Sequence, residues 1–197
     1  PNGPAGGWDG GRVQVANRPL IRGDEVWLYY GGDAFTHGWP IEYNGYVPRG
    51  DDKQRYARRV AQTSKPTSGI GIAKWRLDGF LSLDAGPDEG TLVTKPLYFS
   101  GTKLEINANA KGGSITMELT DADGKPLDGF SLSDCDPLSD DVVHHIVSWR
   151  GKTDLTLLAG RPTRVRFAIR KASLYAFGFV SEGPTRQAVA AATIEEQ

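Results

Sequence analysis

The sequence contains one cysteine, Cys135, and three histidines. A single cysteine cannot form an intramolecular disulfide, and no recognised nucleophile arrangement includes this one, so we expect a buried thiol. The net charge is -1, which gives no reason to expect a polyanionic partner such as nucleic acid. No apolar run approaches the roughly 18 residues that cross a bilayer, which predicts a soluble chain without a membrane partner.

Several catalytic signatures are also missing. The chain has no Gly-x-Ser-x-Gly elbow, no glycine-rich phosphate loop that opens a helix, and no Cys/His ligand set for a metal. The first residues carry neither an initiator methionine nor a charged-then-apolar signal segment. We therefore expect a processed or excised piece of a longer protein.

What the chain does contain is turn-forming residues, with 25 glycines and 12 prolines, and apolar residues that alternate with polar ones. Clean alternation at 115–119 and 165–169 places apolar side chains on one face of a strand. Short alternating strands separated by frequent turns predict an all-β protein that includes a two-sheet, jelly-roll-like β-sandwich.

Turn-rich residues at 85–90 predict a boundary between domains at 1–86 and 87–181, followed by a flexible tail or short helix at 182–197. Asp78-Gly79 predicts a hairpin between strands at 70–77 and 80–83, because this dipeptide tolerates the positive φ of a tight turn. Residues 31–68 form a long aromatic stretch without periodicity. The other expected strands are 12–15, 25–30, 91–94, 104–108, 114–120, 142–149, 163–169 and 174–180.

Two groups of short motifs carry a family resemblance. Residues 7–10, 28–32, His37, 70–73 and 78–80 resemble the last blade of the five-bladed β-propeller of glycosidases similar to glycoside hydrolase family 32. Residues 90–97, 129–135, 147–149 and 174–179 resemble the C-terminal β-sandwich that accompanies such propellers. The resemblance implies a sandwich preceded by one propeller blade.

The resemblance also implies a function. The chain would be the C-terminal portion of a secreted or periplasmic carbohydrate-active protein whose parent hydrolyses glycosidic bonds, with furanosides as one substrate class. Retaining chemistry needs two carboxylates about 5 Å apart, which such propellers supply from earlier blades, so catalytic residues in this chain are unknown. The remaining blades would belong to the same precursor or to another chain, and the sandwich would brace them.

Within that resemblance, five residues are candidate carbohydrate ligands: Trp8, Asp9, Tyr30, His37 and Trp39. Trp8 would stack on a sugar face and Asp9 would accept hydrogen bonds from hydroxyls, although a turn aspartate beside a packing tryptophan is an equal alternative. Tyr29 and Tyr30 face opposite sides of a strand, so only one can line a pocket. His37 could stabilise its loop instead, and the aromatic loop around Trp39 could cover a neighbouring blade.

A calcium site is a weaker candidate. Asp134 and Asp136, with Asp140 and Asp141 nearby, supply hard oxygen ligands, but their spacing does not match an EF-hand and strand-end turns are the default interpretation. Adjacent histidines at 144–145 diverge on a strand and are poor joint ligands. No other cofactor is expected.

Two other functions remain open. The chain could be a non-catalytic, lectin-like binding or adhesion module that uses surface aromatics such as Trp149 or Tyr98. It could also be a structural subunit that completes a propeller with a second polypeptide.

Overall fold

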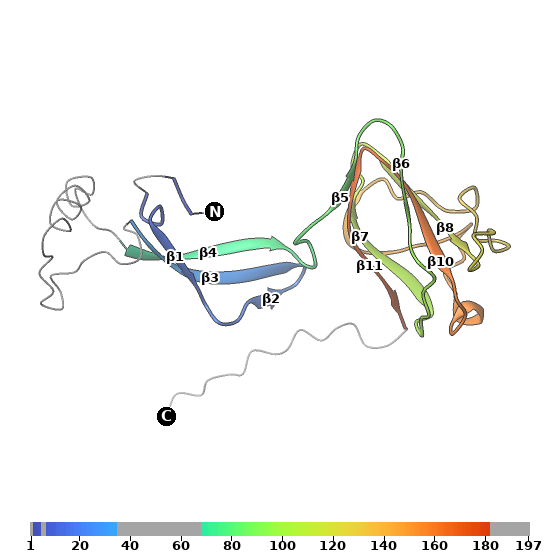
Figure 1. The fold of residues 1–197 in the computed structure, drawn as a ribbon, viewed down its shortest axis with the longest axis horizontal. Coiled ribbons are helices and arrows are strands. Elements are labelled where there is room, and N and C mark those ends of the chain that lie inside the picture. Colours follow the sequence, from blue (N-terminus) through green and yellow to red (C-terminus); the bar gives the residue numbers. More distant parts are fainter. Residues whose placement is uncertain (1, 5–6, 35–67, 182–197) are drawn as a thin grey trace, which may run out of the picture. The chain divides into compact units, whose positions relative to one another are not determined.

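The computed structural model describes residues 2–4, 7–34 and 68–181, and across these residues it contains β-strands and no α-helix (Figure 1). The all-β prediction is therefore confirmed. The chain divides into two compact units, Pro1–Trp75 and Arg76–Gln197. The predicted tail at 182–197 lies outside the described residues.

The first unit is an antiparallel sheet centred on β3. Its strands are β1 (Arg12–Val15), β2 (Leu20–Arg22), β3 (Glu25–Asp33) and β4 (Ser68–Arg76). β1 and β2 pair with successive stretches of β3, and β4 also pairs with β3. Gly23 has a φ of 56° in the two-residue turn between β2 and β3, a conformation that glycine adopts without strain.

Side-chain alternation divides this sheet into two faces, which we call the Tyr30 face and the Trp27 face. The register places Val15 opposite Tyr30 and Leu20 opposite Trp27, so each partner lies on the same face as the residue it opposes. The ammonium of Lys74 lies 3.7 Å from the Trp27 ring centroid. This contact assigns the even-numbered residues of β4 to the Trp27 face.

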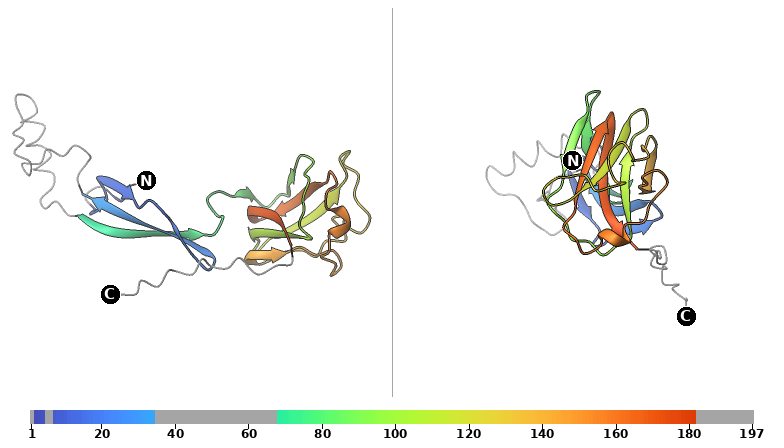
Figure 2. Two further views of the ribbon diagram at one scale, coloured as in Figure 1. Left: turned by 90° about the horizontal axis from the view of Figure 1, so that it is seen from below. Right: turned by 90° about the vertical axis from the view of Figure 1, so that its right-hand side faces the viewer.

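The second unit consists of two antiparallel sheets that face each other (Figures 1 and 2). The four-stranded sheet has the order β5-β11-β7-β9 and the three-stranded sheet has the order β6-β10-β8. Their strands are β5 (Leu83–Ala85), β6 (Gly90–Val93), β7 (Lys103–Asn109), β8 (Ser114–Thr120), β9 (Asp141–Ile146), β10 (Arg164–Arg170) and β11 (Ala172–Val180). Each successive strand belongs to the other sheet, and one 3₁₀ turn, η2 (Thr156–Leu158), precedes β10.

The core lies between these two sheets. It is built from alternating residues of the strands and includes Leu104, Ile106, Ile115, Met117, Leu119, Val165, Phe167 and Ile169, all buried. The apolar side chains that alternate in 115–119 and 165–169 do lie in this core, but burial is not confined to one face, because Glu118 and Ala168 are also buried. Cys135 is also buried in this core, as expected, and burial raises the pKa of its thiol to about 11.

Several details differ from the sequence predictions. Asp78 does adopt a positive φ of 52°, but no hairpin follows, because β5 pairs with β11 through Leu83 and Leu174 instead of with β4. The predicted boundary between the domains follows residue 86, whereas the two compact units divide between Trp75 and Arg76. Strand β2 was not predicted, and β9 ends at Ile146 instead of continuing to Trp149.

Candidate functional site

Three of the candidate carbohydrate ligands meet at one end of the first sheet. Trp8 and Asp9 lie in a turn before β1, and Tyr30 lies on β3. The Trp8 and Tyr30 rings are nearly parallel, with centroids 5.7 Å apart and an angle of 13° between their planes. The Tyr30 hydroxyl donates a hydrogen bond to Asp9 Oδ2 at 3.0 Å.

Backbone hydrogen bonds fix the turn that carries Trp8 and Asp9. The Gly7 amide donates to the Pro4 carbonyl at 2.9 Å, and the Gly10 amide donates to the Gly7 carbonyl at 3.1 Å. The Gly11 amide then donates to the Asp33 carbonyl at 2.9 Å, which joins the end of the turn to β3. The turn is therefore attached to the strand that carries Tyr30.

The hydrogen bond to Asp9 affects the ionisation of Tyr30. The hydrogen bond to Asp9, with smaller contributions from burial and the carboxylate charge, raises the pKa of Tyr30 above its usual 10. Tyr30 consequently stays protonated at neutral pH and donates, while Asp9 accepts. A carboxylate has lone pairs for more than one donor, so Asp9 retains capacity to accept from a ligand hydroxyl.

The described residues of the first sheet give Asp9 no carboxylate partner for glycosidic chemistry. Asp33 lies on the opposite face of β3 from Tyr30, where Arg12 forms an ion pair with it and the Ser68 hydroxyl donates at 2.7 Å. The Ser68 hydrogen bond and the Arg12 charge hold the pKa of Asp33 below its usual value. Asp9 and Asp33 therefore cannot flank the same glycosidic bond.

Two other predicted ligands, His37 and Trp39, lie outside the described residues. Tyr29 is 44% exposed on the Trp27 face, away from Asp9. The structure therefore identifies Tyr30 as the member of the tyrosine pair that belongs to the site.

The acidic segment around Cys135 receives hydrogen bonds from its own chain. The Ser131 hydroxyl donates to Asp134 at 2.7 Å, and its hydrogen bond lowers the pKa of that carboxyl. Ser148 and the Gly151 amide donate to Asp136 Oδ2 at 2.5 and 2.8 Å and likewise lower its pKa. Among the described residues no group of three or more ligand-type side chains could hold a metal ion. The hydrogen bonds hold Asp134 and Asp136 within turns of their own segment, and the calcium site stays a prediction.

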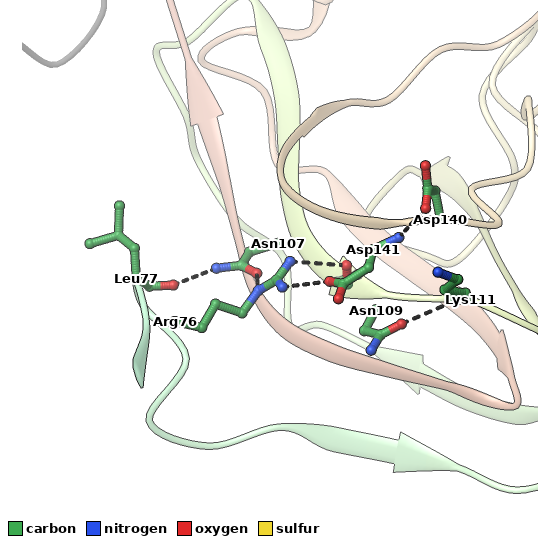
Figure 3. A network of polar contacts seen from close by, with 8 residues as sticks. Arg76, Leu77, Asn107, Asn109, Lys111, Asp140 and Asp141 are labelled. Atoms are coloured by element: carbon green, nitrogen blue, oxygen red, sulfur yellow. Dashed lines mark hydrogen bonds and ion pairs between the residues drawn. The ribbon is translucent and has the colours of Figure 1, made fainter. Parts of the chain in front are cut away.

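The most connected polar network in the second unit surrounds Arg76 (Figure 3). The Arg76 guanidinium donates to the Asn107 side-chain oxygen, to Asp141 Oδ1 at 2.5 Å and to the Ala108 carbonyl at 3.2 Å. The buried Asn107 amide in turn donates to the Leu77 carbonyl at 2.6 Å. This network attaches residues 76–77 to β7 and β9, which is why the second unit begins at Arg76.

The adjacent histidines point in different directions, as predicted. His144 Nδ1 lies 3.1 Å from Glu105 Oε1. His145 pairs with the core residue Ile106 in the β7–β9 register, and its buried Nε2 has no hydrogen-bond partner within the described parts of the chain. Burial lowers the pKa of His145 below 6.5.

This burial predicts an acid-sensitive second unit. The unfolded chain binds the His145 proton at a higher pH than the folded chain, so the neutral ring contributes stability above pH 6.5 that is lost as the pH falls towards the lowered pKa. We expect the urea midpoint to be lower at about pH 5.5 than at about pH 7.5, and a His145→Phe variant to lose part of that difference. An unchanged pH dependence in His145→Phe would contradict the prediction.

One surface aromatic of the lectin-like hypothesis is not on the surface. Trp149 is 1% exposed and belongs to the core, whereas Tyr98 is 74% exposed. The expectation that Trp149 is a surface aromatic is therefore wrong.

Comparisons with protein-family models, with curated proteins and with solved structures found no match. In the described residues, no helix has the length and apolarity to span a membrane.

Proposed function

We propose that this chain is the C-terminal portion of a carbohydrate-active, glycoside hydrolase-like protein, in which Trp8, Asp9 and Tyr30 bind and orient a sugar. The convergence of these three side chains from two separate segments carries the proposal. Aromatic rings offer apolar faces to the C–H groups of a sugar, and a carboxylate accepts from its hydroxyls. Binding sites commonly combine such apolar surfaces with a few placed polar groups.

The first unit is proposed to be one blade of a family 32-like five-bladed propeller. Apolar side chains are exposed on both of its faces: Val15 and Ile21 on the Tyr30 face, and Leu20, Tyr29, Ile70 and Ile72 on the Trp27 face. A blade within a propeller has a neighbour on each side, and a single sheet of this size is marginally stable without such packing. The partners would be the remaining blades, in the same precursor or in another chain.

The second unit is proposed to be a jelly-roll-like β-sandwich that braces the propeller. Its successive strands alternate between the two sheets, which is the connectivity of a jelly roll. An isolated bridge between Ile115 and Leu138 extends the three-stranded sheet beyond β8, in the place of a fourth strand. The reacting carboxylates of the parent hydrolase would lie in other blades.

A lectin-like binding module is the second candidate. One observation favours it: Trp8, Asp9 and Tyr30 come together within this chain, without a residue from another polypeptide. Sugar binding by the isolated chain would favour the module, and sugar binding that requires additional blades would favour the hydrolase fragment.

Affinity electrophoresis through gels that contain furanose or pyranose polysaccharides tests the site. We expect the longer protein that contains the remaining blades to be retarded and Asp9→Ala in that protein to weaken binding about tenfold or more, because hydrogen bonds to charged groups are among the stronger ones. Tyr30→Phe should weaken binding to a smaller extent, since it removes the donor that orients Asp9.

Tyr29→Phe is the matched control, because it makes the same chemical change one residue away on the opposite face of β3. It should bind like the parent chain. Equal losses in the two tyrosine variants, or no loss with Asp9→Ala, would contradict the assignment of the site.

A further inference from the structure

Two glycines lie directly beneath the aromatic side chains of the candidate site. Gly71 is on β4 and Gly32 is on β3, and neither is among the glycines with positive φ. Their backbone conformations therefore do not require glycine. Glycine is disfavoured inside a strand relative to alanine, so another physical reason must account for it at these positions.

Available space supplies that reason. A Cβ added at Gly71 would lie 2.6 Å from both Cε1 and Oη of Tyr30 and closer still to Cζ. A Cβ added at Gly32 would lie 2.6 Å from Trp8 Cζ3 and 2.6 Å from Asp9 Cβ. All of these distances are shorter than real Cβ contacts, so the rings occupy the volume that a side chain would need.

We propose that Gly71 and Gly32 are positioning residues of the candidate site. Gly71 lets the Tyr30 ring approach the backbone of β4 closely enough for its hydroxyl to reach Asp9. Gly32 provides the same close approach for Trp8 and Asp9 on β3. The proposed sugar contact rests on the function stated above, but the positioning of the rings does not require a sugar.

Gly71→Ala tests the proposal through the ionisation of Tyr30. The added methyl group should displace the ring and break the hydrogen bond to Asp9, so that the phenol pKa falls back towards 10. Nuclear magnetic resonance of chains labelled with ¹³Cζ-tyrosine can follow this titration, with Tyr30→Phe used to assign the signal. Asp9→Asn gives the pKa expected when the carboxylate is lost.

Gly31→Ala is the matched control. Gly31 neighbours Gly32 on β3 but faces the other side, and an added Cβ would meet only the Gln14 carbonyl, at 4.0 Å. The Tyr30 titration should be the same in Gly31→Ala as in the parent chain. An unchanged titration in Gly71→Ala would overturn the proposal.

A double-mutant cycle covers the case in which Gly71→Ala unfolds the first unit. If the Tyr30 ring is the obstacle, Gly71→Ala should lower the urea midpoint of the parent chain but not that of a Tyr30→Ala chain, where the ring is absent. An equal decrease in both backgrounds would overturn the proposal. A changed Tyr30 titration, with no polysaccharide binding even when the remaining blades are present, would support the positioning role and count against the proposed function.

Discussion

Replacement of Trp149 by alanine is expected to lower the free energy of unfolding of the second unit by about 3–5 kcal/mol. The indole is 1% exposed and packs edge-on against Phe130, with ring centroids 5.3 Å apart. Its Nε1–H donates to the Met117 carbonyl at 2.9 Å. The substitution therefore creates a cavity in the core and removes the donor to a buried carbonyl.

Urea unfolding followed by far-ultraviolet circular dichroism measures this loss without relying on tryptophan fluorescence. Tyr98→Ala is the matched control, because it also truncates an aromatic side chain but one that is 74% exposed. It should change stability by less than about 0.5 kcal/mol. A Trp149→Ala loss as small as that of the control would show that the indole does not pack as described.

Arg76→Ala is expected to destabilise the second unit by about 2–3 kcal/mol. The substitution removes the donors to Asn107, Asp141 and the Ala108 carbonyl, and Asn107 is only 5% exposed. A buried acceptor that loses its donor cannot regain full hydration, so the cost exceeds that of an ordinary surface ion pair. The guanidinium also lies 5.0 Å from the Tyr175 ring centroid, which adds a cation–π contact to the loss.

Arg150→Ala is the control for this prediction. Arg150 forms an ion pair with Asp134 at 2.5 Å, but its side chain is 79% exposed. The free energy of unfolding measured by urea should therefore fall by less than about 1 kcal/mol in Arg150→Ala. It should fall clearly more in Arg76→Ala. Equal effects of the two substitutions would mean that the Asn107 network adds nothing beyond a solvated ion pair.

Sequence alternation was sufficient to predict β8 and β10, because the apolar residues of each strand that enter the core recur with a period of two that is visible in the sequence. The hairpin after β4 was predicted wrongly for a different reason. Asp78-Gly79 specifies a turn locally, but the partner of β5 is β11, which lies far along the chain. Local turn chemistry contains no information about that long-range pairing.

The candidate site was likewise predictable from local residue types only in part. The residue types of Trp8, Asp9 and Tyr30 suggested sugar contacts individually, but only the register of β3 decides that Tyr30 and not Tyr29 faces Asp9. The Arg76 network was missed altogether. Its available signal was Asn107, a residue type depleted in strands, at a position inside the expected strand 104–108.

The alternation of strands between the two sheets has a consequence for synthesis of the chain. No strand of the second unit pairs with its neighbour in sequence, and β11, the last strand, lies between β5 and β7. The four-stranded sheet therefore cannot be completed during synthesis until β11, through Val180, has left the ribosomal exit tunnel. Such non-local pairing is typical of domains that fold over milliseconds to seconds.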